Sequence, residues 1–145
     1  VKDSRVTFWN YKKIIDNKNV DLVFGETYGL LNNSKFALVT SGTATLETAL
    51  FNVPQIICYR TSYLTYLIAK TIIKTKYISL VNILLNRLVV KELIQSQLNT
   101  KNLKRELDLL INDSRNIYQD YKILKEKLNE KGASKKIAEF IYSSI

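Results

Sequence analysis

The sequence predicts an α/β fold, a Rossmann-like parallel sheet with flanking helices, followed by a helical C-terminal tail. Short apolar runs alternate with amphipathic segments over residues 20–80, which is the order typical of parallel strands connected by helices. From about residue 89 the apolar spacing is helical. The 145 residues are 46% hydrophobic and 24% charged, an ordinary globular composition at a length sufficient for a core.

Four segments have the composition of buried strands. Each is short, rich in aliphatic and β-branched residues, and bounded by turn-forming residues or by a proline. In open parallel sheets ligands bind past the carboxyl ends of the strands, so the loops that follow these segments are candidate sites. The predicted strands are residues 20–24, 36–40, 55–59 and 77–80.

Helices are predicted where apolar residues recur at intervals of three and four. The predicted helices are residues 26–33, 43–51, 63–74, 100–111, 114–129 and 134–145. The change from mixed to purely helical patterning places a boundary near residue 98. We therefore expect an α/β domain over residues 1–98 and C-terminal helices over residues 99–145, which pack on the same domain or on a partner domain.

The chain is basic, with 22 Lys and Arg against 13 Asp and Glu, a formal net charge of +9. The excess lies in the middle, because no acidic residue occurs between Thr48 and Lys91. This distribution favours an anionic partner, such as a phosphate-bearing ligand or an anionic membrane surface. The tyrosines of this stretch fall in predicted strands and on an apolar helix face, which suits a core better than base stacking. We therefore expect no nucleic-acid partner.

Several kinds of chemistry are excluded by what the sequence lacks. The absence of histidine removes histidine-based catalysis and most zinc sites. Cys58 is the single cysteine, so no internal disulfide can form, and its place in a predicted strand suits a small core residue. No motif requires a metal or a cofactor. No apolar run approaches the roughly 18 residues of a membrane span, and residues 1–5 lead into no signal peptide.

The loop after the second predicted strand is the best candidate for a binding site. Gly42 allows a sharp turn and a close approach of the backbone to a ligand. The helix that follows offers unpaired N–H groups and a partial positive charge, both of which favour phosphate. Glu47 lies about one turn later, where its carboxylate could accept two ribose hydroxyls. The simpler alternative is that the segment only caps a helix and Glu47 faces the helix dipole.

This loop and several spaced motifs closely resemble the lipid-A-disaccharide synthase family over about residues 20–95. The segments that carry the resemblance are Ser41-Gly42-Thr43-Ala44-Thr45-Leu46-Glu47, Val53-Pro54, Tyr59-Arg60, Leu64-Thr65-Tyr66, Lys76-Tyr77-Ile78-Ser79-Leu80, Asn82-Ile83-Leu84 and Glu92-Leu93. The resemblance implies a GT-B glycosyltransferase, in which two Rossmann-like domains bind the donor in the cleft between them. That family transfers 2,3-diacylglucosamine from its UDP derivative to 2,3-diacylglucosamine 1-phosphate, forming the β-1,6 disaccharide of lipid A.

The resemblance also implies roles for individual residues. The loop of residues 41–45 faces the UDP diphosphate, Glu47 holds the ribose, and Asn82 lies near the donor. The full set of candidate donor-binding residues is Ser41, Gly42, Thr43, Ala44, Thr45, Glu47, Arg60, Asn82, Glu92 and Gln95. Val81 and Lys91 depart from the family pattern, since each stands where a proline is common.

The resemblance covers only the donor-binding C-terminal half of the family, and that half is incomplete at its N-terminus. The acceptor domain and the general base belong to the missing half, so we expect the chain alone to be inactive. The implied location is the cytoplasm, at the inner face of the cytoplasmic membrane of a Gram-negative bacterium. The C-terminal helices could pack on the missing half or form a homodimer. The alternatives are another UDP-sugar GT-B transferase, or a non-catalytic basic binding or scaffolding domain.

Overall fold

The computed structural model describes residues 20–40, 42–62 and 76–129. The chain divides into two compact units, Val1–Asn33 and Ser34–Ile145. In the first unit, helix α2 (Thr27–Asn32) confirms the predicted helix at residues 26–33. The strand predicted for residues 20–24 was wrong, because these residues have no regular structure. An apolar segment forms a strand only where a second strand pairs with its backbone, and no described strand does so here.

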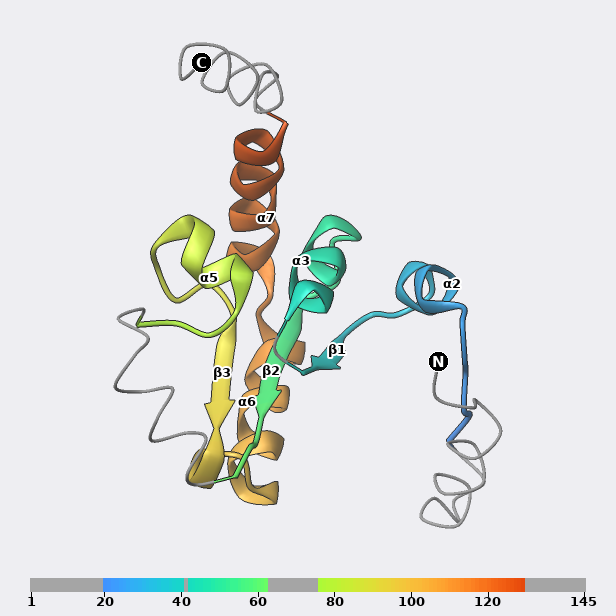
Figure 1. Ribbon diagram of the computed structural model, residues 1–145, viewed down its shortest axis with the longest axis vertical. Helices are drawn as coiled ribbons and strands as arrows, with labels where there is room; N and C mark the ends of the chain where they lie inside the picture. Colours follow the sequence, from blue (N-terminus) through green and yellow to red (C-terminus); the bar gives the residue numbers. More distant parts are fainter. Residues whose placement is uncertain (1–19, 41, 63–75, 130–145) are drawn as a thin grey trace, which may run out of the picture. The chain divides into compact units, whose positions relative to one another are not determined.

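The second unit contains a three-stranded parallel sheet in the order β1-β2-β3 (Figure 1). Its strands are β1 (Ala37–Val39), β2 (Gln55–Tyr59) and β3 (Lys91–Ile94). Strands β1 and β2 confirm the predictions for residues 36–40 and 55–59. The parallel sheet with helices on both faces confirms the predicted Rossmann-like α/β class.

The helices of this unit divide between the two faces of the sheet. One face packs against α3 (Thr43–Leu50), α5 (Leu80–Leu85) and α7 (Arg115–Leu128). The other face packs against α6 (Thr100–Asn112), as Figure 1 shows. Helices α3, α6 and α7 confirm the predictions for residues 43–51, 100–111 and 114–129. The helices predicted for residues 63–74 and 134–145 lie outside the described residues.

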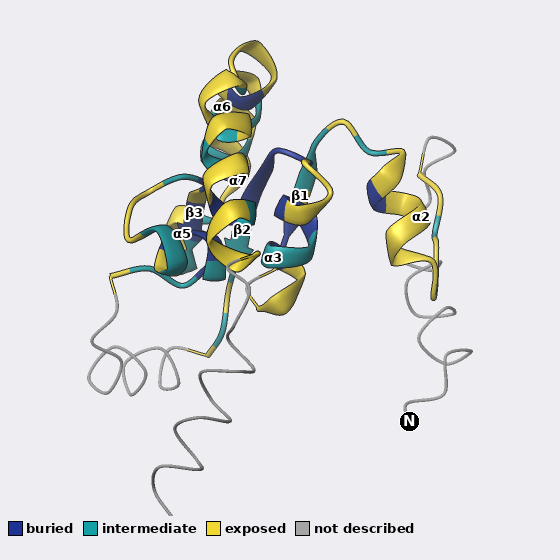
Figure 2. Ribbon diagram, turned by 90° about the horizontal axis from the view of Figure 1, so that it is seen from above, coloured by how far each residue is buried: buried dark blue, intermediate teal, exposed yellow. Residues whose placement is uncertain are grey.

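Two clusters of buried side chains hold these layers together. Figure 2 shows that buried residues occur in the sheet and in the helices around it. On the second face of the sheet, Ile56 and Leu93 pack against Leu110 of α6. The first cluster joins β2 to α3, α5 and α7 through Ile57, Ala49, Val81, Tyr121 and Leu124. Among the described residues, no helix has the length and apolar character needed to cross a membrane.

Two predictions around β3 were wrong. Residues 77–79 form an irregular turn, not a strand, and α5 begins at Leu80. Ser79 caps this helix, since its Oγ accepts the N–H of Asn82 at 3.3 Å. Residues 91–94, which follow the point where helical patterning was expected, form β3 instead and pair with β2. The polar pair Lys91 and Glu92 obscures this strand, because buried parallel strands usually read as continuous apolar runs.

Candidate functional site

The loops that follow the three strands lie at one edge of the sheet, the carboxyl edge. The strands are parallel, and the register pairs Val39 with Ile57 and Tyr59 with Ile94. The described residues after β1 lead through Gly42 into α3, those after β2 begin with Arg60, and β3 is followed at once by Gln95. Ligands bind at this edge of open parallel sheets. The sheet therefore brings three of the predicted motif positions to the same edge.

The amino end of α3 has the geometry of an anion-binding turn. Gly42 is its N-cap, with φ 132° and ψ −162°, a backbone conformation that residues other than glycine rarely adopt. No side chain among the described residues caps this helix. Thr43 and Ala44 are exposed in its first turn, where helical N–H groups have no partner within the helix. These amides and the helix dipole attract an anion at this end.

Thr45 belongs to the same turn but its hydroxyl serves the protein itself. It is fully buried and donates to the carbonyl oxygen of Gly42 at 2.8 Å. This hydrogen bond fixes the turn and uses the hydroxyl proton, so the Thr45 hydroxyl does not donate to a ligand. Ser41 lies outside the described residues.

Glu47 lies one helical turn after Thr43, on the same side of α3. It is half-buried, and its carboxylate makes no hydrogen bond or ion pair with any described residue. A carboxylate in this state can accept hydroxyl groups from a ligand held at the amino end of the helix. The ribose-binding role that the resemblance implies for Glu47 stays a prediction.

Asn82 and Glu92 form a buried network instead of facing this edge. Asn82 donates to the carbonyl of Val90 and to the Glu92 carboxylate, each at 2.8 Å. Its Oδ1 accepts the N–H groups of Val89 and Val90 at 2.8 and 2.9 Å. Every hydrogen-bonding site of this side chain is therefore used by the chain itself. Asn82 is fully buried, which follows from this role.

The Glu92 carboxylate completes the network from β3. Its oxygens accept the N–H of Ile78 at 3.0 and 3.2 Å and the N–H of Ser79 at 2.9 Å. With the bond from Asn82, the carboxylate faces donors only, as an ionised acceptor requires. Glu92 is 8% exposed. It fixes the turn before α5 to the sheet, in the way that a bound anion would at a helix N-terminus.

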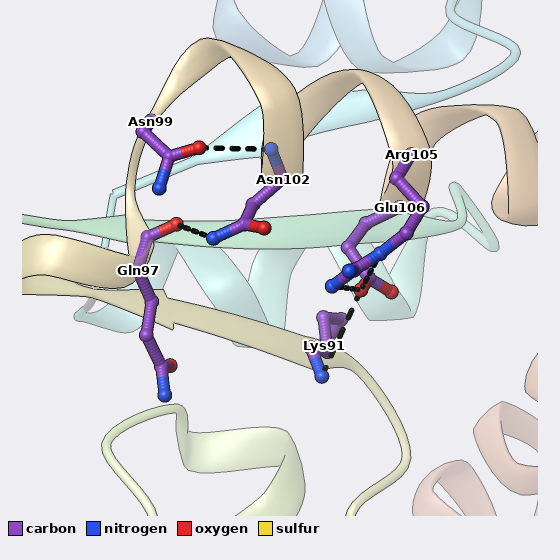
Figure 3. Close-up of polar contacts among 6 residues, drawn as sticks. All are labelled: Lys91, Gln97, Asn99, Asn102, Arg105 and Glu106. Atoms are coloured by element: carbon purple, nitrogen blue, oxygen red, sulfur yellow. Dashed lines mark hydrogen bonds and ion pairs between the residues drawn. The ribbon is translucent and has the colours of Figure 1, made fainter.

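The two departures from the family pattern have local explanations. Val81 occupies the first turn of α5, where a proline would lose no helical hydrogen bond, and its side chain is fully buried in the core. Lys91 begins β3, and its Nζ lies 3.9 Å from a carboxylate oxygen of Glu106 on α6 (Figure 3). A proline is tolerated at the first residue of a strand. Both positions lie at the start of an element, where a proline can be accommodated.

Arg60 and Gln95 are connected through Thr61, the residue that follows Arg60 in the chain. Gln95 accepts the N–H of Thr61 on its Oε1 at 3.0 Å and donates from Nε2 to the Thr61 carbonyl at 3.1 Å. Arg60 is exposed, and no described residue pairs with its guanidinium. Residues 61 and 95 are 34 positions apart, so no sequence spacing signals this contact.

The remaining candidates for chemistry on the described residues are absent or inert. No group of three or more His, Cys, Asp or Glu side chains there could hold a metal ion. Cys58 packs against the α6 cluster, and burial raises the pKa of its thiol, which disfavours the nucleophilic thiolate. Its expected role as a small core residue is confirmed by this packing.

The fold and its carboxyl edge define the class: an α/β domain of the Rossmann type, with a helix N-terminus beside the sheet that no described side chain caps. The family model described as lipid-A-disaccharide synthetase matches residues 2–143. This chain therefore belongs to the lipid-A-disaccharide synthase family, a family of glycosyltransferases.

Individual relatives agree with this assignment. The chain is 41% identical over 131 residues to a lipid-A-disaccharide synthase of Synechocystis sp., covering 86% of this chain and 33% of that protein. It is 34% identical over 143 residues to the synthase of Persephonella marina, covering 91% of this chain and 38% of that protein. A third synthase, from Chromobacterium violaceum, is 46% identical over 92 residues, covering 63% of this chain and 24% of that protein. The chain thus spans about a third of the length of the first two of these relatives.

Proposed function

We propose that this chain forms the donor-binding part of a lipid-A-disaccharide synthase. The donor is UDP-2,3-diacylglucosamine, and its diphosphate binds at the amino end of α3. The observation that supports the proposal is the pairing of two features: the turn at Gly42, which no described side chain caps, and the carboxylate of Glu47 one helical turn later, which has no partner among the described residues. The first feature suits the diphosphate and the second suits the two ribose hydroxyls.

In the complete enzyme, this end of α3 would also assist the chemistry. Direct displacement of UDP by the acceptor hydroxyl leaves growing negative charge on the diphosphate. The N–H groups of Thr43 and Ala44 and the guanidinium of Arg60 stabilise charge that develops there. The helix dipole alone contributes about 0.3–1 kcal/mol per charge at an exposed site.

The chain by itself is proposed to be inactive. The reaction joins two substrates, and most of its acceleration comes from holding the acceptor hydroxyl against the donor carbon. Among the described residues, no histidine or free carboxylate other than Glu47 lies at the carboxyl edge to deprotonate that hydroxyl. The acceptor side and the general base are assigned to the part of the relatives that this chain does not span.

Calorimetric titration of the chain with UDP tests the proposal. The parent chain is expected to bind UDP, and Glu47→Ala is expected to weaken binding about tenfold, the loss of hydrogen bonds to a charged acceptor. Glu126→Ala is the matched control, because Glu126 is exposed on α7 and away from this edge. Equal UDP affinity in the Glu47→Ala variant would remove the ribose assignment. Preferential binding of an oligonucleotide over UDP at physiological salt would favour the basic binding domain instead.

A further inference from the structure

The pairing of β2 and β3 ends abruptly at the carboxyl edge. Tyr59 and Ile94 are the last residues that the two strands pair. Immediately after Ile94, Gln95 turns the chain into the short 3-10 helix η1 (Gln95–Gln97). The main chain of β3 therefore leaves before it can pair with the segment at Arg60 and Thr61.

The side chain of Gln95 takes the place of the departing main chain. Its Oε1 accepts from the Thr61 N–H at 3.0 Å, and its Nε2 donates to the Thr61 carbonyl at 3.1 Å. A carboxamide carries the same donor and acceptor as a peptide group. It thus extends the ladder past the last strand pair and holds both backbone groups of one residue.

The backbone of Gln95 has an unusual conformation at this turn. Gln95 has φ 51°, in the left-handed region that residues with a Cβ seldom occupy. Such conformations persist where the surrounding structure holds them, and they cluster at functional positions. Here the turn directs the side chain of Gln95 back toward the end of β2, where it makes its two hydrogen bonds to Thr61.

We infer that Gln95 is a positioning residue that fixes Arg60 for contact with the diphosphate of the donor. Arg60 precedes the clamped Thr61 and follows the central strand of the sheet. Among the described residues that directly follow the strands, Arg60 is the cationic one. A guanidinium suits a diphosphate because it offers several donors in a fixed planar fork. This inference rests on the proposed function and assigns Gln95 no contact with the donor.

A double-mutant cycle on UDP affinity tests the inference. The variants are Arg60→Ala, Gln95→Met and the two combined, where methionine keeps the length of the side chain but removes both hydrogen bonds. Gln97→Met is the matched control on the same 3-10 helix, since Gln97 is exposed. Each single variant at 60 or 95 is expected to weaken UDP binding about tenfold. The combined variant is expected to lose no more than Arg60→Ala alone, because Gln95 acts through Arg60.

The outcomes separate the two proposals. Unchanged affinity in Gln95→Met, or losses that multiply in the combined variant, would overturn the positioning role while leaving UDP binding intact. Failure of the parent chain to bind UDP would overturn the proposed function, and the role of Gln95 toward the donor with it. A Gln95→Met chain that does not fold is replaced by Gln95→Asn, which keeps a neutral carboxamide but is one methylene too short to make both hydrogen bonds to Thr61. The same non-additive loss is expected of that variant.

Discussion

Replacing Glu92 with glutamine separates a structural role from a donor-binding role for this residue. Glutamine keeps the shape of the side chain but replaces one carboxylate oxygen with an N–H donor. If the remaining oxygen stays with Ser79 and Asn82, the new donor faces the N–H of Ile78, which accepts nothing. One hydrogen bond to a charged acceptor is lost, at about 1.5–3 kcal/mol, and the others lose their charge assistance.

The expected result is a free energy of unfolding lowered by about 2–4 kcal/mol, or a Tm lowered by roughly 7–13 °C for a chain of this size. Urea unfolding followed by circular dichroism measures the change. Glu106→Gln is the control, since the partners of Glu106 are the exposed cations Lys91 and Arg105, and a surface ion pair contributes about 1 kcal/mol or less. Unchanged stability of Glu92→Gln together with weaker UDP binding would refute the structural role and favour a donor contact.

Two further variants probe the turn and the core. Gly42→Ala is expected to destabilise the chain by about 1–2 kcal/mol and to weaken UDP binding, since φ 132° is unfavourable for alanine; unfolding and titration measure the two effects. Tyr121→Phe removes a hydroxyl that donates to the Val53 carbonyl at 3.2 Å and accepts from Gln55 at 3.1 Å. This change is expected to lower the free energy of unfolding by about 1–2 kcal/mol, as measured by thermal unfolding.

Tyr121 also predicts a pH dependence of stability. Burial raises the pKa of Tyr121, so the folded chain keeps the phenol proton at a pH where the unfolded chain, with the ordinary tyrosine pKa of about 10, loses it. Deprotonation stabilises the unfolded chain relative to the folded one, so the free energy of unfolding decreases as the pH rises above about 10. The Tyr121→Phe variant lacks this contribution and is expected to lose less stability than the parent between neutral and alkaline pH. An identical alkaline loss in both chains would contradict the prediction.

The elements that the sequence predicted correctly are those whose pattern is local. Strand β2 is a continuous apolar run after Pro54, and α3 begins directly after Gly42, so both could be placed from neighbouring residues. Helices α6 and α7 have clear apolar stripes with polar residues on the opposite side. In each case burial against the core enforces the same period that the sequence shows.

The two incorrect predictions around β3 share one cause, a hydrogen-bond partner that lies elsewhere in the chain. Strand β3 contains Glu92, whose burial is compensated by N–H groups from residues 78 and 79, and no local pattern shows this. The same contact draws residues 77–79 into a turn although their composition favours a strand. Tertiary hydrogen bonds here override local propensity.

The candidate site was predictable in part for a related reason. The turn at Gly42 and the carboxylate of Glu47 lie within one short segment, so spacing alone points to them. Asn82 and Glu92 were grouped with them through the family resemblance, and the structure places both in a buried network. The contact between Gln95 and Thr61 joins two strand ends, and it becomes visible only when the sheet is assembled.

The most direct test of donor binding is an amide NMR titration of the chain with UDP. The largest shifts are expected at Thr43 and Ala44, with Glu47 and Thr61 next, and Glu47→Ala is expected to reduce them at equal UDP concentration. Shifts confined to other parts of the chain, or no shifts at millimolar UDP, would contradict the assignment of the amino end of α3 as the diphosphate site.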